Sequence, residues 1–267
     1  MRRYSIVVVS IMAFTALVVA CTKVPITGRK QMNLLPESEM IGMSLQAYSE
    51  FLASASVVPD SDSRTQMVKR LGSRIKSSVE QFLRDNGQEK RIEGFQWEFN
   101  LVNDPSINAW CMPGGKVVVY TGILPVTQDE ASLAVVMGHE IAHAIARHGN
   151  ERMSQGLLLQ AGGVALSVLI SEKPQLAQDL FLQSYGIGGT LGILAFSRQH
   201  ELEADKMGLI FMAMGGYDPR VAPDFWERMA AGGGAAPPEL LSTHPSDETR
   251  IQELTAFMPE ALKYYKQ

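Results

Sequence analysis

The chain has 267 residues, of which 46% are hydrophobic and 19% charged, a balance typical of a globular protein with a substantial apolar core. This length is enough for one large domain or two small ones. The formal net charge is −4, and no basic run follows the first three residues, so nothing in the charge pattern supports nucleic-acid binding.

The N-terminus has the features of a secretory signal peptide. Two arginines precede an apolar stretch from Ile6 to Val19, which is shorter than a typical membrane-spanning helix. Cys21 directly follows the small residue Ala20, and this arrangement resembles a bacterial lipoprotein signal, in which the cysteine thiol carries the lipid. We therefore expect removal of residues 1–20 and a lipid on Cys21. An uncleaved N-terminal anchor is the alternative.

The residues around the lipidation site predict where the protein is held. Thr22 stands where Asp would favour retention in the inner membrane of Gram-negative bacteria, so a periplasmic protein anchored to the outer membrane is the expectation. Residues 21–36 are polar and contain prolines and a glycine, which predicts a lipidated tether before a folded domain at residues 37–267. With Cys21 lipidated, Cys111 has no partner for an internal disulfide and is expected to be a small buried hydrophobe.

Two helices and two strands are predicted in the first half of the domain. Hydrophobic spacing predicts helices at residues 37–53 and 63–85. Alternation from Phe95 to Val102 predicts one strand, and the run from Lys116 to Tyr120, preceded by Pro-Gly-Gly, predicts another.

The next helix carries the main motif and is predicted from Ala131 to Arg147. Thr127 and Glu130 have the form of a capping box at its start. Gly149 is suited to end it.

Two apolar, glycine-rich stretches follow, at residues 156–170 and 180–196. Each is short for a membrane span and is interrupted by polar residues, so we expect helices that cover the active-site core. Membrane hairpins, or a lid that touches the membrane, are the alternatives. Further on, the pattern predicts a helix from Ser197 to Met214, a flexible loop at residues 231–238 and a closing helix from about Ser246.

His139 and His143 have the spacing of two metal ligands on one helix. Residues four apart differ in direction by only about 40°, so both imidazoles can reach one ion. Glu140 flanks the same position, where a carboxylate can take a proton from a zinc-bound water. Apolar neighbours predict that this face is buried, and a metal would offset the cost of burying its polar groups. The H-E-x-x-H pattern therefore predicts a zinc site with Glu140 as the general base.

A catalytic zinc needs a third protein ligand and an open position. The segment from Ser197 to Asp205 supplies a candidate, because Glu201 and Asp205 share one helix face. We expect Glu201 to bind zinc and Asp205 to hydrogen-bond the far nitrogen of a ligand histidine. Glu203 points to the opposite side and is expected to be solvated or paired, and His200 is turned too far to be a good ligand.

Together these motifs resemble a known family. H-E-x-x-H, followed by S-R-x-x-E-x-E-A-D and T-H-P-S-x-x-x-R, is similar to the gluzincin peptidases that include HtpX, the type I CAAX prenyl protease, mitochondrial Oma, BepA and LoiP. The resemblance runs from about Pro36 to Met258, and the segment from Val24 to Arg29 looks most like the lipoproteins nearest LoiP. It implies an α+β, mainly helical zincin-type domain, a small sheet whose edge strand borders the active site, and one Zn²⁺ per chain.

The resemblance also assigns roles by position. The residues that match the family's metal site are the zinc ligands His139, His143 and Glu201, the base Glu140 and the supporting carboxylate Asp205. The residues that match the segment leading into the edge strand are Asn108, Ala109 and Trp110. In the family this edge pairs with extended substrate by strand addition.

Two residues near the C-terminus have more than one expected role. His244 matches a histidine that either stabilises the tetrahedral oxyanion or caps the zinc as a fourth ligand, and both roles stay open. Arg250 is expected either to pair with acidic residues near the site or to lie on the surface.

The motifs thus predict a zinc-dependent endopeptidase that cleaves extended segments, and the resemblance implies unfolded or misassembled envelope proteins as its substrates. Its contact with the membrane would be the lipid on Cys21. A second hypothesis is a latent protease, its zinc capped by His244, that acts mainly as a chaperone-like factor with the outer-membrane assembly machinery. A purely structural zinc site is a third, against which Glu140 argues because a structural site needs no base.

Overall fold

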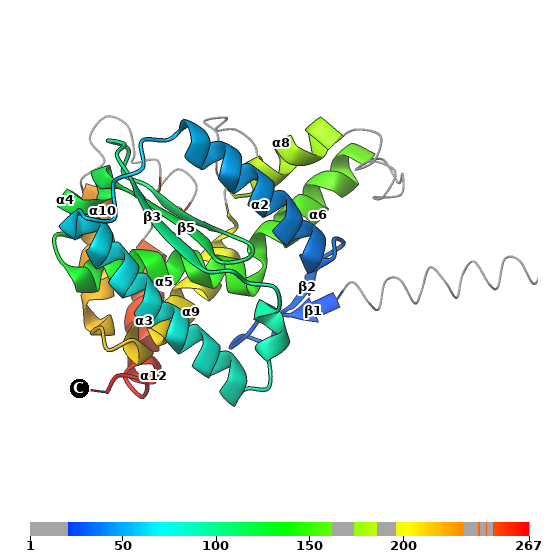
Figure 1. Ribbon diagram of the computed structural model, residues 1–267. Helices are drawn as coiled ribbons and strands as arrows, with labels where there is room; N and C mark the ends of the chain where they lie inside the picture. The colour runs from blue at the N-terminus through cyan, green and yellow to red at the C-terminus, as the bar shows by residue number, and fades with distance from the viewer. Residues whose placement is uncertain are drawn as a thin grey trace, which may run out of the picture.

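The computed structural model describes residues 21–161, 174–185, 196–231, 240, 244 and 248–266. The chain forms a mainly helical α+β structure, as expected, in which a three-stranded sheet has helices on both faces (Figure 1). The predicted signal peptide, most of the two apolar stretches and most of the 231–238 loop lie outside the described residues. No helix in the described ranges is long and apolar enough to cross a membrane.

The helices are α2 (Glu37–Ser54), α3 (Ser63–Asp85), α4 (Leu124–Thr127), α5 (Glu130–Ala146), α6 (His148–Ala161), α8 (Pro174–Ser184), α9 (Arg198–Met214), α10 (Ala222–Ala231) and α12 (Glu248–Ala261). The strands are β1 (Cys21–Lys23), β2 (Lys30–Met32), β3 (Glu98–Val102), β4 (Ala109–Met112) and β5 (Lys116–Tyr120). The ranges of α2, α3 and β5 agree with prediction to within one residue. β3 begins later than predicted, because the Gln96 amide bonds to Gly114 in the turn before β5 rather than within the strand ladder.

The three-stranded sheet has the order β3-β5-β4, with β3 parallel and β4 antiparallel to β5. Within the described ranges β4 is therefore an edge strand, and it packs against α5. In the tight turn between β4 and β5, Gly114 and Gly115 have φ of +82° and +78°, a conformation that favours glycine. A Cβ on Gly115 would also lie 2.7 Å from the ring of Trp97.

Successive residues of the sheet point to opposite faces and fill two cores. Val117 and Val119 of β5 and Cys111 of β4 pack with α3, α5 and α9, whereas Val118 and Trp110 pack with α2, α6 and α8. Cys111 is therefore a buried core residue, as predicted, and burial raises the pKa of its thiol well above the usual value.

The helices α5 and α9 cross at two glycines. A Cβ on Gly208 would lie 2.9 Å from the backbone nitrogen of His139, and one on Gly138 would lie 3.0 Å from the carbonyl oxygen of Gly208. Because neither position carries a side chain, the backbone of α9 lies directly against α5 at the H-E-x-x-H motif. This crossing brings the two halves of the predicted zinc site together.

Gly208→Ala is expected to lower the free energy of unfolding by about 1–3 kcal/mol, because its methyl group has no space between the two backbones. Alanine otherwise favours a helix over glycine by roughly 1 kcal/mol. Gly42→Ala in α2 is the matched control, since nothing lies within 4 Å of its added Cβ and stability should rise slightly. Chemical denaturation followed by circular dichroism measures both variants. A Gly208→Ala protein as stable as the Gly42→Ala protein would contradict the close crossing.

Both ends of α5 differ from the prediction. Its N-cap is Asp129, whose carboxylate accepts a hydrogen bond from a first-turn amide at 2.7 Å, and Thr127 instead ends α4. At the other end Arg147 adopts a left-handed conformation with φ of +62°, and α6 begins at His148. The chain turns before Gly149, so the predicted glycine stop and the predicted capping box are both wrong.

Residues 21–35 are packed on the domain, where a polar tether was expected. β1 and β2 pair antiparallel, and Val24 in the loop between them is buried. The side chain of Asn150 on α6 donates to the carbonyl of Leu35 at 3.0 Å. The segment is thus a hairpin held by tertiary contacts, and its lipid attachment stays a prediction.

Candidate metal centre

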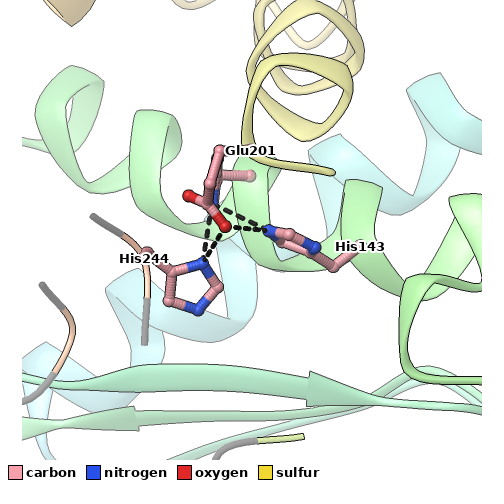
Figure 2. A group of neighbouring side chains, drawn as sticks. His143, Glu201 and His244 are labelled. Atoms are coloured by element: carbon pink, nitrogen blue, oxygen red, sulfur yellow. Dashed lines mark hydrogen bonds and ion pairs between the residues drawn. The ribbon is translucent and has the colours of Figure 1, made fainter. Parts of the chain in front are cut away.

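Four buried side chains from three parts of the chain meet at one point. His139 and His143 come from α5, Glu201 from the first turn of α9, and His244 from the chain before α12. Each residue is at most 4% exposed, and their ligand atoms all lie within 4.8 Å of one another. Figure 2 shows the Glu201 carboxylate directed at both His143 and His244.

The donor atoms have the spacing of ligands around one tetrahedral ion. Nε2 of His143 lies 3.0 Å from Nε2 of His139, which lies 3.2 Å from Nδ1 of His244. The same His244 nitrogen lies 2.9 Å from Oε1 of Glu201. Ligands at zinc-bond length from a tetrahedral ion lie about 3.3 Å apart, and imidazole nitrogens with a carboxylate oxygen are a donor set that zinc accepts. The four residues therefore fit a single zinc ion.

A carboxylate and an arginine support His139. Oδ1 of Asp205 lies 2.8 Å from Nδ1 of His139, and Arg250 donates to both Asp205 oxygens at 2.7 Å. Burial raises the pKa of Asp205, but the charge of Arg250 and the hydrogen bond of His139 lower it below its usual value. The ionised carboxylate accepts the Nδ1 proton of His139 and leaves the Nε2 lone pair directed at the metal position.

Arg250 pairs with acidic residues at the site, which is the first of its two expected roles. Its guanidinium lies 3.6 Å from the centre of the Trp226 ring, and Nη1 lies 3.2 Å from Oε2 of Glu201. The side chain is 3% exposed. A surface position for Arg250 is therefore wrong, and the arginine balances the two carboxylates beside the metal position.

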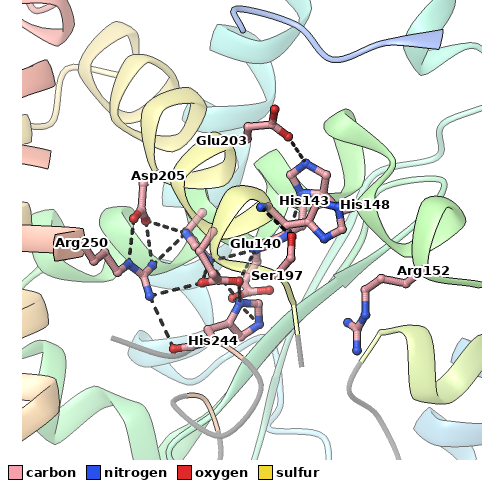
Figure 3. A network of polar contacts seen from close by, with 12 residues as sticks. Glu140, His143, His148, Arg152, Ser197, Glu203, Asp205, His244 and Arg250 are labelled. Carbon is pink, nitrogen blue, oxygen red and sulfur yellow. Dashed lines mark hydrogen bonds and ion pairs between the residues drawn. The ribbon is translucent and has the colours of Figure 1, made fainter. Parts of the chain in front are cut away.

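His143 is supported by a histidine that the sequence patterns did not single out. Nδ1 of His148 lies 2.9 Å from Nδ1 of His143, and Nε2 of His148 lies 3.0 Å from the Glu203 carboxylate (Figure 3). Burial lowers the pKa of His143 well below its usual value and that of His148 to about 4, so both imidazoles are neutral at pH 7. Neutral imidazole is the form that binds zinc. Glu203, expected to be solvated or paired, is buried and paired.

The Glu140 carboxylate is buried beside the four-residue cluster. Its Oε1 lies 3.7 Å from Nε2 of His244 and has no hydrogen-bond partner among the described residues. Burial raises its pKa to about 7, and a divalent cation nearby would lower the pKa again. Beside a bound cation Glu140 would therefore be an ionised carboxylate at neutral pH, in a position to accept a proton. His200, expected to be a poor ligand, lies outside the cluster and binds Glu151 at 3.0 Å.

The segment of this chain that is predicted to pair with substrate lies at the edge of the sheet. Ala109 and Trp110 begin β4, and Asn108 precedes it and accepts a hydrogen bond from the β5 residue Tyr120 at 3.1 Å. The indole of Trp110 points away from α5 and packs on Phe51, with 5.0 Å between ring centres. Trp110 is thus a core residue of the opposite face, and only the backbone of β4 can serve a partner strand.

The segment that carries His244 is bonded to the chain entering β4. The amide of Leu240 donates to the carbonyl of Ile107 at 3.2 Å, and the amide of His244 donates to the carbonyl of Leu240 at 2.8 Å. The segment that carries His244 is therefore held near the start of the edge strand β4.

Residues 70–258, more than half of the chain, match Peptidase family M48. The mitochondrial metalloendopeptidase OMA1 of Arabidopsis thaliana is 40% identical over 181 residues, which are 66% of this chain and 35% of that protein. The OMA1 protein of Schizosaccharomyces pombe is 34% identical over 248 residues, which are 89% of this chain and 66% of that protein. The beta-barrel assembly-enhancing protease of Yersinia pestis is 31% identical over 194 residues, which are 71% of this chain and 38% of that protein.

The chain spans between about one third and two thirds of the length of these relatives. Members of the matched family use zinc, and the matched range contains all four residues of the cluster that could hold one metal ion. The sequence match and the geometry of the site agree with the predicted gluzincin relationship and with a zinc cofactor. The chain therefore belongs to peptidase family M48.

Proposed function

We propose that the protein is a zinc-dependent endopeptidase that hydrolyses peptide bonds in unfolded or misassembled envelope proteins. The observation that carries the proposal is the buried cluster of three histidines and a glutamate, with the Glu140 carboxylate beside it. Oε1 of Glu140 has no hydrogen-bond partner in the described part of the chain. A structural zinc site needs no such carboxylate, whereas hydrolysis needs a base next to the metal.

The residues divide the chemistry between holding the metal and moving a proton. His139, His143 and Glu201 would hold zinc, which supplies a Lewis acid that polarises the scissile carbonyl and makes water more acidic. Glu140 takes the proton of the attacking water and can then deliver it to the leaving amine. Asp205 keeps His139 in the tautomer that presents Nε2 to the metal.

Extended segments are proposed as substrates because of β4. Among the described residues this strand is paired with β5 on one side only, and it lies against α5, which carries Glu140. The backbone groups on the free side of an edge strand can pair with an added strand of a peptide. A compact folded protein does not offer such a segment, so unfolded or misassembled proteins are the substrates that fit.

The envelope location rests on the N-terminal sequence and on the name of a relative. Cys21 and Thr22 fit a lipidated protein held at the outer membrane and facing the periplasm, as in the LoiP-like lipoproteins. One relative is a beta-barrel assembly-enhancing protease, which favours outer-membrane assembly machinery as a partner.

A second candidate is a latent protease that acts mainly in assembly, and the position of His244 favours it. Nδ1 of His244 lies among the other donor atoms, 3.2 Å from His139 and 2.9 Å from Glu201. A zinc with four protein ligands has no open position for water or substrate. On this proposal His244 must leave the cluster before a peptide bond is cleaved.

Zinc content and chelator sensitivity test the proposed function. The full chain, purified in detergent, is expected to contain about one zinc per chain by mass spectrometry and to cleave casein until a chelator removes the metal. A protein substrate compared in its folded and its reduced, unfolded form should be cut only when unfolded. Folded enzyme without zinc would contradict the metal site. Zinc-loaded enzyme that leaves casein intact, both as wild type and as His244→Ala, would contradict the endopeptidase.

A further inference from the structure

The loop of the N-terminal hairpin places an arginine between two carboxylates of the domain. Arg29 donates from Nη1 and Nη2 to the two oxygens of Glu151 at 2.8 and 2.7 Å. It donates from Nε and Nη2 to the two oxygens of Glu203 at 2.8 and 2.9 Å. Thr27 of the same loop also donates to Glu203, at 3.0 Å. Because Glu151 lies on α6 and Glu203 on α9, one side chain joins the hairpin to both helices.

Each of these carboxylates also binds a buried histidine. Glu203 lies 3.0 Å from Nε2 of His148, and Glu151 lies 3.0 Å from Nε2 of His200. The two imidazoles stack with 4.5 Å between their centres. The two carboxylates could surround a cation, and here that cation is the guanidinium of Arg29. The glutamate side chains are 8% and 4% exposed and that of Arg29 is 18% exposed, so the charges are largely withdrawn from water.

This group of residues reaches the metal centre through His148. The Glu203 carboxylate accepts the Nε2 proton of His148, which leaves the lone pair of His148 on Nδ1. That nitrogen accepts the Nδ1 proton of His143, 2.9 Å away. Nε2 of His143 then carries a lone pair at the metal position. Figure 3 shows Glu203, His148 and His143 in this order beside the cluster.

We propose that Arg29 is a positioning residue for the zinc ligand His143, acting through Glu203 and His148. Docking of the N-terminal hairpin then sets how tightly the metal is held. This inference rests on the zinc site of the proposed function and does not depend on which substrate is cleaved.

Removal of Arg29 leaves two buried carboxylates without their cation. The arrangement becomes costly, because each carboxylate loses charge-assisted hydrogen bonds and the two repel each other. Glu203 then turns towards the solvent that replaces the guanidinium. It no longer accepts the Nε2 proton of His148 in a fixed position, so the tautomer of His148 is no longer fixed. Loss of the outer partner of a ligand histidine typically weakens metal binding by about 10- to 100-fold.

Zinc affinity of the full chain in detergent, measured by competition with a chromophoric chelator, tests the proposal without a substrate. Arg29→Ala is expected to bind zinc about 10- to 100-fold more weakly than the wild type. Arg29→Lys keeps the charge but cannot bond to both carboxylates in the same way, so its affinity should lie between these two. Lys30→Ala is the matched control, because Lys30 is the exposed neighbouring cation of the same hairpin. Its affinity should stay within about twofold of the wild type.

A purely structural role for Arg29 gives a different result. It predicts a lower midpoint of thermal unfolding for the zinc-free protein together with unchanged zinc affinity, and that outcome would overturn the proposal. If Arg29→Ala does not fold, Glu203→Gln decides, since it removes the charge that fixes His148 and leaves the bonds between Arg29 and Glu151 in place. Wild-type zinc affinity in Glu203→Gln would also overturn it. Weakened zinc binding in Arg29→Ala, together with zinc-loaded wild type and His244→Ala proteins that both leave casein intact, would support this inference and contradict the proposed function.

Discussion

Glu140→Gln is expected to lower the rate of casein cleavage by about 10²- to 10⁴-fold, while the protein still holds about one zinc per chain. The glutamine amide keeps the size of the side chain but cannot accept the proton of the attacking water. Glu140 is not one of the four clustered donor residues, so the zinc content should not change. Cleavage rates compared at equal zinc loading, with zinc measured by mass spectrometry, give the effect.

Glu130→Gln on the same helix is the control for this variant. Glu130 lies in the first turn of α5, where it pairs with the exposed Arg70, so its charge should affect the rate by less than about twofold. Wild-type cleavage by Glu140→Gln would show that this carboxylate is not the base. In cells, deletion of the gene shows which envelope functions depend on the protein. A Glu140→Gln strain that keeps all of these functions would favour the assembly role over proteolysis.

The candidate metal ligands on α5 and α9 could be predicted because helix geometry is local. A helix fixes the relative direction of residues four apart, so His139 and His143 share a face wherever that helix lies, and the same holds for Glu201 and Asp205. The spacing carried no information on how the two helices meet. That depends on the crossing of two glycines, which becomes visible only when the backbones are in contact.

His148 could not be placed from helical spacing, because a helix break separates it from the motif. α5 ends at Ala146, and the left-handed Arg147 redirects the chain before α6 begins. The direction of His148 relative to His143 therefore does not follow from a rotation of about 100° per residue. The available signal was a further histidine five positions after His143, which by itself predicts neither a contact nor a role.

The N-terminal hairpin was unpredictable for a different reason. Its strands β1 and β2 have three residues each, and such short polar strands give no periodic pattern. Arg29 is held by carboxylates that lie 122 and 174 residues further along the chain. The composition of residues 21–36 therefore indicated a tether, whereas ion pairs between distant residues decide where the segment lies.

His244→Ala is expected to raise the rate of casein cleavage by roughly tenfold or more. In the structure Nδ1 of His244 lies 2.9 Å from Glu201 and 3.2 Å from His139, so removing the imidazole opens the fourth position around the metal. If His244 caps the metal in about nine of ten wild-type molecules, the rate rises about tenfold when every molecule is open. The measurement is the initial cleavage rate at equal zinc loading.

The opposite result would identify the other role of His244. A histidine that stabilises the oxyanion is needed for turnover, and its loss should lower the rate by about 10²- to 10³-fold. The geometry favours the cap, because the ring that presents Nδ1 to the cluster also turns Nε2 towards Glu140, 3.7 Å away. One imidazole thus fills the fourth ligand position and covers the base. Three protein ligands suffice to keep zinc in a catalytic site. If His244 is a removable cap, the His244→Ala protein should therefore both cleave casein faster and keep its zinc. A His244→Ala protein that loses its zinc would instead make His244 a ligand on which metal binding depends.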